Sequence, residues 1–146
     1  MTEYCTAAQV SNRLKAAGYT HLADDDGDGS VEADEITANI TPCIEWAGAQ
    51  IDYALVNHEP PYDLSSARAA GNTFLRTIAV DIAAWAVFTN GGRDVPESIQ
   101  AAYDRDMEML NAIREDGDIV PGLSGGVPEA VKEQQYVYEH ISELIP

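Results

Sequence analysis

The chain has 146 residues, 45% of them hydrophobic, and its 25 acidic against 8 basic side chains give a formal net charge of −17. This length and apolar content predict one folded domain with a sizeable core. The excess of acid argues against general binding to nucleic acid or to an anionic membrane surface, because both need Lys and Arg to contact phosphate.

The chain shows no sign of targeting or of a disulfide framework. Its start, MTEYCTAAQV, has neither a basic segment nor a long apolar run, so we expect no secretory signal. No window approaches the roughly 20 apolar residues of a membrane span, so no membrane partner is expected. Cys5 and Cys43 are expected to be small buried side chains in a reducing compartment.

The first predicted element is a short helix. TAAQ at residues 6–9 is a capping box, in which Thr6 caps the helix and Gln9 reaches back to it. Val10 and Leu14 share one face of this helix, and Gly18 is expected to end it.

The next stretch, ADDDGDGSVEADEI at residues 23–36, matches the calcium-loop pattern D-x-D-x-D-G-x5-E. Calcium takes six to eight oxygen ligands at about 2.3–2.6 Å, whereas magnesium resists an all-protein cage. We therefore expect a calcium ion here, held by Asp24, Asp26, Asp28, the backbone carbonyl of Ser30, Glu32 and Glu35. The alternative is an acidic, solvated turn that only starts the next helix.

This predicted loop lacks the surroundings of a calcium sensor. A sensor needs an entering helix against an exiting one and a Met-rich groove that opens. Here the preceding helix ends near Gly18, no second loop follows, and Met1, Met107 and Met109 form no groove pattern. We therefore expect the calcium loop to be a structural staple, that is, a site whose bound ion holds the loop in one conformation and orders the start of the next helix.

Apolar residues three or four apart predict helix from residue 36 to 55. Pro42 should kink this helix or divide it into two nearly coaxial segments, with Thr41 able to cap the second. HEPPYD at residues 58–63 is expected to be a loop.

The segment at residues 72–92 is the most apolar predicted helix, capped by Asn72 and ended by Gly91 and Gly92. Such a helix should be central in the fold or covered by a partner. Asp81 interrupts it. That carboxylate could be a general acid, but an ion pair with Arg76 or with a base from another helix is the simpler interpretation.

From Pro96 to about residue 116 a further amphipathic helix is expected, and residues 1–116 would then form the folded domain. Residues 117–146 are predicted to be a Gly- and Pro-rich linker and a C-terminal helical arm that begins at Pro128 and faces a partner. The predicted fold is therefore all-α: a small bundle of about four core helices with an EF-hand-like calcium loop and a C-terminal arm.

Few residues in the chain suggest catalysis. His21, His58 and His140 are scattered, neither cysteine has an obvious His partner, and no phosphate-binding glycine loop occurs. We expect no enzymatic activity and no catalytic residues.

Five short motifs occur in a characteristic order. They are YCT at residues 4–6, DDDGDG at 24–29, Ile51-Asp52, AVDIAAW at 79–85, and VPESI with AYDRDMEML between 95 and 110. Across roughly residues 3–124 the chain resembles a family of Mu-like phages and prophages that is related to the head–tail connector, or adaptor, proteins of tailed phages.

This resemblance implies a structural protein of the virion neck, present in the host cytoplasm during assembly. Its copies would form a ring, commonly of about twelve, between the portal protein and the tail completion or stopper protein. The C-terminal arm would contact the portal. DNA would pass through the ring without being bound specifically, because an acidic lumen offers few Lys or Arg side chains to contact phosphate.

Two other functions stay open at this stage. The chain could be a calcium-binding regulatory module that presents its C-terminal helix to a partner. A much weaker alternative is a small hydrolase built around Asp81.

Overall fold

The computed structural model describes residues 3–19 and 22–124, and every regular element within these ranges is helical. The α-helices are α1 (Ala7–Ala16), α2 (Ala33–Glu35), α3 (Thr41–Val56), α4 (Leu64–Ala69), α5 (Thr73–Asn90) and α6 (Glu97–Asn111), and two π-helical segments are η1 (Ile36–Ile40) and η2 (Ala112–Asp116). The all-α prediction is confirmed for this part of the chain. The helix predicted after Pro128 lies outside the described residues.

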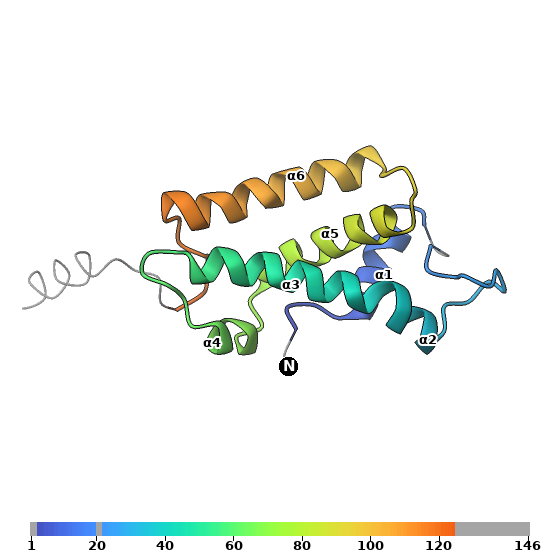
Figure 1. Cartoon of the computed structure of the whole chain (residues 1–146), viewed down its shortest axis with the longest axis horizontal. Coiled ribbons are helices and arrows are strands. Elements are labelled where there is room, and N and C mark those ends of the chain that lie inside the picture. Colours follow the sequence, from blue (N-terminus) through green and yellow to red (C-terminus); the bar gives the residue numbers. More distant parts are fainter. Residues whose placement is uncertain (1–2, 20–21, 125–146) are drawn as a thin grey trace, which may run out of the picture.

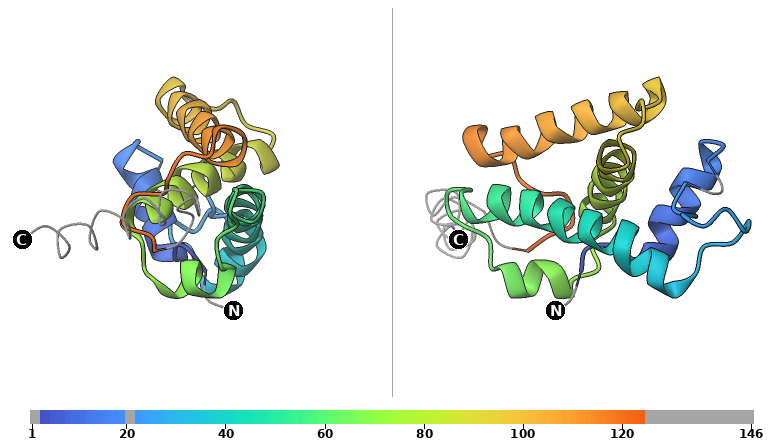
Figure 2. Two further views of the ribbon diagram at one scale, coloured as in Figure 1. Left: turned by 90° about the vertical axis from the view of Figure 1, so that its left-hand side faces the viewer. Right: turned by 45° about the vertical axis from the view of Figure 1, so that its right-hand side comes forward.

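Helix α5 is the centre of the bundle. It contacts α1, α3 and α6, which surround it in Figures 1 and 2. Its buried apolar residues are Leu75, Ile78, Ala79, Ile82, Ala83, Ala84, Ala86, Val87 and Phe88. The side chain of Asn72 accepts a hydrogen bond from the N–H of Leu75 at 3.0 Å, as its predicted capping role requires. The prediction that residues 72–92 form a central helix is confirmed.

Helix α1 begins with the predicted capping box. The Gln9 side chain accepts from the N–H of Thr6 at 2.9 Å, and the Thr6 hydroxyl accepts from the N–H of Gln9 at 3.3 Å. The helix ends at Ala16, and Gly18 turns the chain with a φ of +89°.

Helices α2 and α3 are joined without a break through η1, and Pro42 lies in the first turn of α3. The N–H of Thr41 bonds the carbonyl of Ile36, five residues back, and Pro42 needs no donor at the first turn of α3. The prediction that helix continues across Pro42 is confirmed, and the irregularity before the proline is the π-helical segment η1. The predicted capping role of Thr41 is wrong: its backbone is helical, and its hydroxyl donates to the Ile36 carbonyl instead.

The predicted loop at residues 58–63 is present and is followed by α4, a helix that the sequence did not indicate. Asp63 caps α4 by accepting from the N–H groups of Ser65 and Ser66. LSSARA has too few apolar residues to show a helical period, so only its cap could have signalled it.

The start of the predicted linker lies on the bundle. Val120 is 1% exposed, and its N–H donates to the Tyr62 hydroxyl at 3.0 Å. The Nε2 atom of the buried His58 lies 3.1 Å from the carbonyl oxygen of Gly117, within hydrogen-bonding distance. These contacts fasten residues 117–120 to the loop between α3 and α4.

Candidate metal centre

The acidic loop between α1 and α2 projects from one end of the bundle (Figure 1) and is folded by its own carboxylates. Asp24 accepts hydrogen bonds from the N–H groups of Gly27 at 2.7 Å and Gly29 at 2.9 Å. Asp26 accepts from the N–H of Asp28 at 3.0 Å. The bend relies on glycine, because φ is +76° at Gly27 and +94° at Gly29.

The loop gathers five of the six predicted ligand residues. Carboxylate oxygens of Asp24, Asp26 and Asp28 lie within 4.8 Å of one another, and so do those of Asp26, Glu32 and Glu35. Asp26 belongs to both groups and links them. The sixth predicted residue, Ser30, points its hydroxyl at Asp28, to which it donates at 2.8 Å, and also at Glu32.

The buried acid of the loop is Glu35, which ties the loop to the start of α2. One of its oxygens accepts from the N–H of Asp25 at 2.6 Å, and the other accepts from the N–H of Glu32 at 3.0 Å. The first oxygen also accepts from the N–H of Asp26 at 3.4 Å, so only the oxygen bonded by Glu32 keeps a lone pair for a cation. The all-oxygen donor set fits a hard divalent ion such as calcium.

The pKa of Asp24 shows that the loop favours the ionised form of this carboxylate. Desolvation alone would raise that pKa, but hydrogen bonds from the N–H groups of Gly29 and Gly27 outweigh it and lower the pKa below its usual value. An ionised carboxylate is the form that coordinates a cation.

The loop has a helix on its exit side only. Helix α1 ends at Ala16, and residues 17–19 and 22–23, which lead to Asp24, are not helical. A helix–loop–helix calcium module has helices on both sides of the loop. The predicted irregular approach to the loop is thus confirmed, and a two-helix opening motion has no first helix to move.

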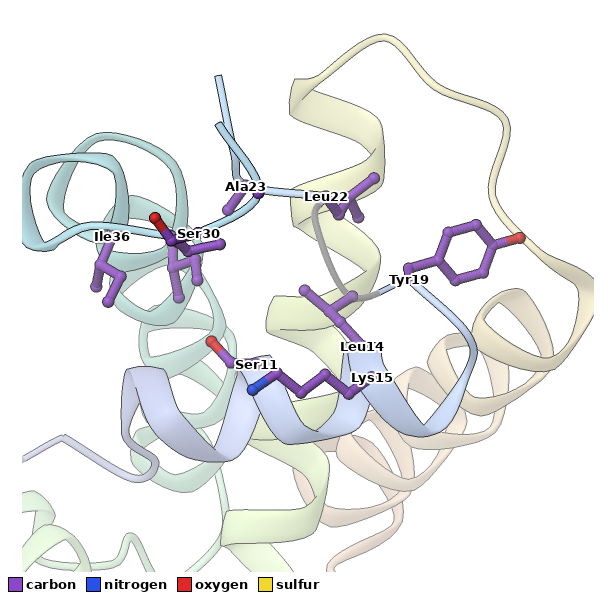
Figure 3. Close-up of a pocket in the computed structure, with 11 residues that line it drawn as sticks. Ser11, Leu14, Lys15, Tyr19, Leu22, Ala23, Ser30 and Ile36 are labelled. Atoms are coloured by element: carbon purple, nitrogen blue, oxygen red, sulfur yellow. The ribbon is translucent and has the colours of Figure 1, made fainter. Parts of the chain in front are cut away.

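Between α1 and the acidic loop lies a cavity of about 290 Å³ (Figure 3). Ser11, Leu14 and Lys15 of α1 line one side, while Ser30 and Ile36 line the other. On this side the cavity separates the acidic loop from α1.

Two partly buried polar clusters join the helices away from this loop. In the first, Asp81 of α5 is 6% exposed and is bonded by Arg13 of α1 at 2.7 Å and by Arg105 of α6 at 3.0 Å. The predicted pairing of Asp81 with a base from another helix is confirmed. The alternative pairing with Arg76 is wrong, because that side chain donates to the carbonyl of Gly71.

Asp106 extends the first cluster. It is 1% exposed, one carboxylate oxygen accepts from Arg105 at 2.9 Å, and the other has no hydrogen-bond partner. Desolvation raises the pKa of Asp106 to about 6; Arg105 acts against this rise, and the charge of Asp81 adds to it.

The second cluster joins the amino terminus to α3 and α4. The Tyr4 hydroxyl donates to Asp52 at 2.7 Å, and Arg68 forms an ion pair with the same carboxylate. Burial first, and then the hydrogen bond to Asp52, raise the pKa of Tyr4. Cys5 beside it is buried, which raises the pKa of its thiol to about 12.

The family model described as Bacteriophage Mu, Gp36 matches residues 4–138. The chain belongs to the Bacteriophage Mu Gp36 family. No curated protein and no solved structure matches it significantly. The predicted resemblance to proteins of Mu-like phages is confirmed, and the relation to head–tail connectors stays a prediction.

In this Gp36-family protein the motifs that are distant in sequence meet in space. Tyr4 of YCT meets Asp52 of the Ile51-Asp52 pair, and Asp81 of AVDIAAW meets Arg105 of AYDRDMEML. The roles of Arg13, Arg68, Arg105 and Asp106 were not foreseen. The sequence shows an acid on an apolar helical face, which indicates a buried carboxylate. It does not show which base pairs with that carboxylate.

Among the residues that the structure describes, the other candidate groups of this Gp36-family protein do not come together in a shared site. His58 bonds backbone carbonyls, while His21 and His140 lie outside the described residues. Cys43, like Cys5, is buried and free, as expected. Among the described helices none is long and apolar enough to cross a membrane.

Proposed function

We propose that this protein is a head–tail connector of a tailed phage, with its copies arranged as a ring between portal and tail. The observation that carries the proposal is the family match over residues 4–138. Membership in a phage Mu family supports a structural or morphogenesis role. The connector assignment further proposes where the protein lies in the virion, between portal and tail, and that it joins the two.

Polar contacts between helices suit a subunit that must keep its shape within an assembly. Asp81 joins α1, α5 and α6 through two arginines, and Asp52 joins the amino terminus, α3 and α4. Asp81 is buried, so the loss of both of its arginines would leave an unpaired charge in the core, and these contacts favour one arrangement of α1, α5 and α6. A rigid block is what a ring between two large assemblies requires.

The charge of the chain suits a channel for DNA. At −17 per copy, a ring of subunits repels phosphate and provides few cationic contacts to retain the duplex. DNA would pass through without specific binding.

We further propose that the acidic loop binds calcium and acts as a structural staple. Its carboxylates converge and repel one another without a cation, and Glu35 connects the loop to α2. The regulatory-module alternative requires a helix on each side of the loop, and the non-helical approach to Asp24 speaks against it.

The partners of the proposed ring are the portal protein and the tail completion or stopper protein. The arm predicted at residues 117–146 would reach the portal. Because Val120 is buried against the bundle, we place the docking segment within residues 125–146.

Deleting the gene from the phage genome tests the proposal. We expect DNA-filled heads and complete tails to accumulate separately, as seen by electron microscopy of lysates, and a wild-type copy supplied in trans should restore joined particles. Normal joining without the gene would contradict the proposal, and so would heads or tails that fail to form at all.

A further inference from the structure

Helix α3 has a second apolar face besides the one that it buries. Its buried residues are Cys43, Ile44, Ala47, Ile51, Ala54 and Leu55. On the opposite side of the helix, apolar residues follow one another at alternating steps of four and three and are all exposed: Pro42, Trp46, Ala49, Tyr53 and Val56. We call this set the α3 stripe. Apolar residues at this spacing are what a second helix packs against.

The large side chains of the α3 stripe are held by neighbours and still meet solvent. Trp46 stacks on Trp85 with ring centroids 5.8 Å apart, and the Arg114 guanidinium lies 5.1 Å from the ring centroid of Tyr53. Even so, Trp46 is 37% exposed, Tyr53 54% and Val56 49%. Among the residues that the structure describes, half of the exposed large hydrophobic side chains lie on this one face. Such a concentration marks an interaction surface.

The helix predicted from Pro128 has an apolar face of the same kind. At 3.6 residues per turn, one side of it would hold Ala130, Val131, Gln134, Val137, Tyr138, Ile141, Leu144 and Ile145. Gln134 is the one polar residue of that face, and all four glutamates of the segment, with Lys132 and His140, fall on the other side. A helix of this length is marginal alone in water and is stabilised when its apolar face is buried.

The two apolar faces match in spacing and in length when they are read in opposite directions. The α3 stripe reads four, three, four and three residues from Pro42 to Val56. The face of the predicted helix reads the same from Ile145 back to Val131. Each covers 14 residue steps, about 21 Å at 1.5 Å per residue. An antiparallel pairing therefore brings the two faces together along their whole length.

The chain is fastened near one end of the α3 stripe shortly before this segment begins. His58, in the loop directly after α3, has its Nε2 atom 3.1 Å from the Gly117 carbonyl oxygen. The N–H of Val120 donates to the hydroxyl of Tyr62 in the same loop at 3.0 Å. The stretch from 124 to 128 spans at most about 14 Å. A helix that starts there follows the stripe by running antiparallel to α3.

We propose that residues 128–146 pack as an antiparallel helix on the α3 stripe of their own copy. The short tether gives the segment a high effective concentration near its own α3, which favours this site over α3 of a second copy. In a chain of net charge −17 the charged side of the helix points away from the bundle, as this arrangement allows. The helix leaves α3 while the bundle stays folded, so it adds little to the melting temperature.

Hydrogen–deuterium exchange of the full chain, read by mass spectrometry, tests this contact. Two variants disrupt it with one added charge each: Ala49→Lys in the centre of the α3 stripe and Ile141→Lys in the apolar face of the arm. Two controls add the same charge elsewhere: Ala8→Lys at an exposed position of α1 and Tyr136→Lys on the charged side of the arm. Circular dichroism checks that the bundle of each variant is folded.

We expect amides within residues 131–145 of the wild type and of both controls to exchange at least about tenfold more slowly than in an unstructured chain. Ala49→Lys and Ile141→Lys should lose this protection while the bundle stays folded. Protection should be equal at low and high micromolar protein concentration, because the contact lies within one chain.

Three results would overturn the proposal. They are exchange at unstructured rates in the wild type, protection that survives Ala49→Lys, and protection that rises with protein concentration, which would assign the arm to α3 of a second copy. If Ala49→Lys unfolds the bundle, Val56→Lys takes its place, because Val56 is 49% exposed at the end of the stripe.

The contact does not rest on the proposed function. In a connector, the charged side of the docked arm, with its four glutamates, is the side left for the portal. If the arm is unprotected while head–tail joining still needs the gene, the proposed function stands and this contact falls. If the arm is protected and joining does not need the gene, the contact stands and the proposed function falls.

Discussion

Asp106 is a buried acid whose local surroundings favour its protonated form. Burial leaves one of its oxygens without a hydrogen-bond partner, and Asp81 adds negative charge nearby. The pKa of Asp106 therefore rises to about 6 from the ordinary 3.8. Because the folded state holds this proton more tightly, its contribution to stability is complete below pH 4 and is lost as pH rises through 6.

Asp106→Asn should therefore stabilise the protein at neutral pH. The amide has no charge to desolvate, and its N–H can donate toward the carboxylate of Asp81. We expect the free energy of unfolding to rise by about 1–3 kcal/mol at neutral pH and the gain to shrink as pH falls toward 4. Urea unfolding across this pH range measures it, with the exposed Asp94→Asn as control. A destabilised variant at neutral pH would contradict this assignment.

At the scale of elements, most helices could be predicted from the sequence. Most of the side-chain contacts between helices could not. The period of apolar residues and the caps at Thr6 and Asn72 are local signals, and α1, α3, α5 and α6 carry them. Helix α4 lacks such a period. The π-helical segment η1 precedes Pro42 in the packed bundle. No local sequence pattern predicts such a segment.

The clustering of carboxylates in the acidic loop was the most predictable feature of a candidate site, because these residues lie within twelve residues of sequence. Calcium binding there stays a prediction. The Asp81 and Asp52 clusters were the least predictable. Their partners lie far away along the chain, and Arg13 and Asp81 are 68 positions apart. Their pairing depends on the packing of whole helices, not on local sequence.

Asn72 joins two elements, and two substitutions separate its contacts. Its oxygen caps α5 at the N–H of Leu75, and its amide donates to the carbonyl of Pro121 at 2.8 Å. Asn72→Ala loses both contacts and should cost about 1–2 kcal/mol. Asn72→Asp keeps the cap and loses only the amide donor, so it should cost less. Chemical unfolding measures both, and equal costs for the two variants would show that the cap contributes nothing.

At the scale of the whole molecule, calcium should stabilise the fold. A ligand that binds only the folded state adds about 2.7 kcal/mol at a hundredfold excess over its Kd. We expect a higher melting temperature in calcium than in EGTA, and a smaller shift in Asp26→Asn, because Asp26 belongs to both carboxylate groups. Asp34→Asn, an acid outside both groups, should behave like the wild type. Identical melting in calcium and EGTA would refute the staple.

Removing residues 125–146 should separate folding from docking. The buried contacts of Val120 lie before the cut, so the melting temperature should change little. Binding to purified portal, measured by co-sedimentation, should be lost. Removal from residue 117 onward should also lower the melting temperature, because it deletes Val120 and the Gly117 carbonyl beside His58. A chain ending at 124 that still binds portal would contradict the role of the arm.

We propose above all that this acidic helical bundle is a structural part of the virion neck. Electron cryomicroscopy of mature particles, focused on the head–tail junction, tests it most directly. We expect a ring of density between portal and tail into which copies of the α1–α6 bundle fit around an open channel. A junction without this bundle, or particles that lack the protein altogether, would contradict the account.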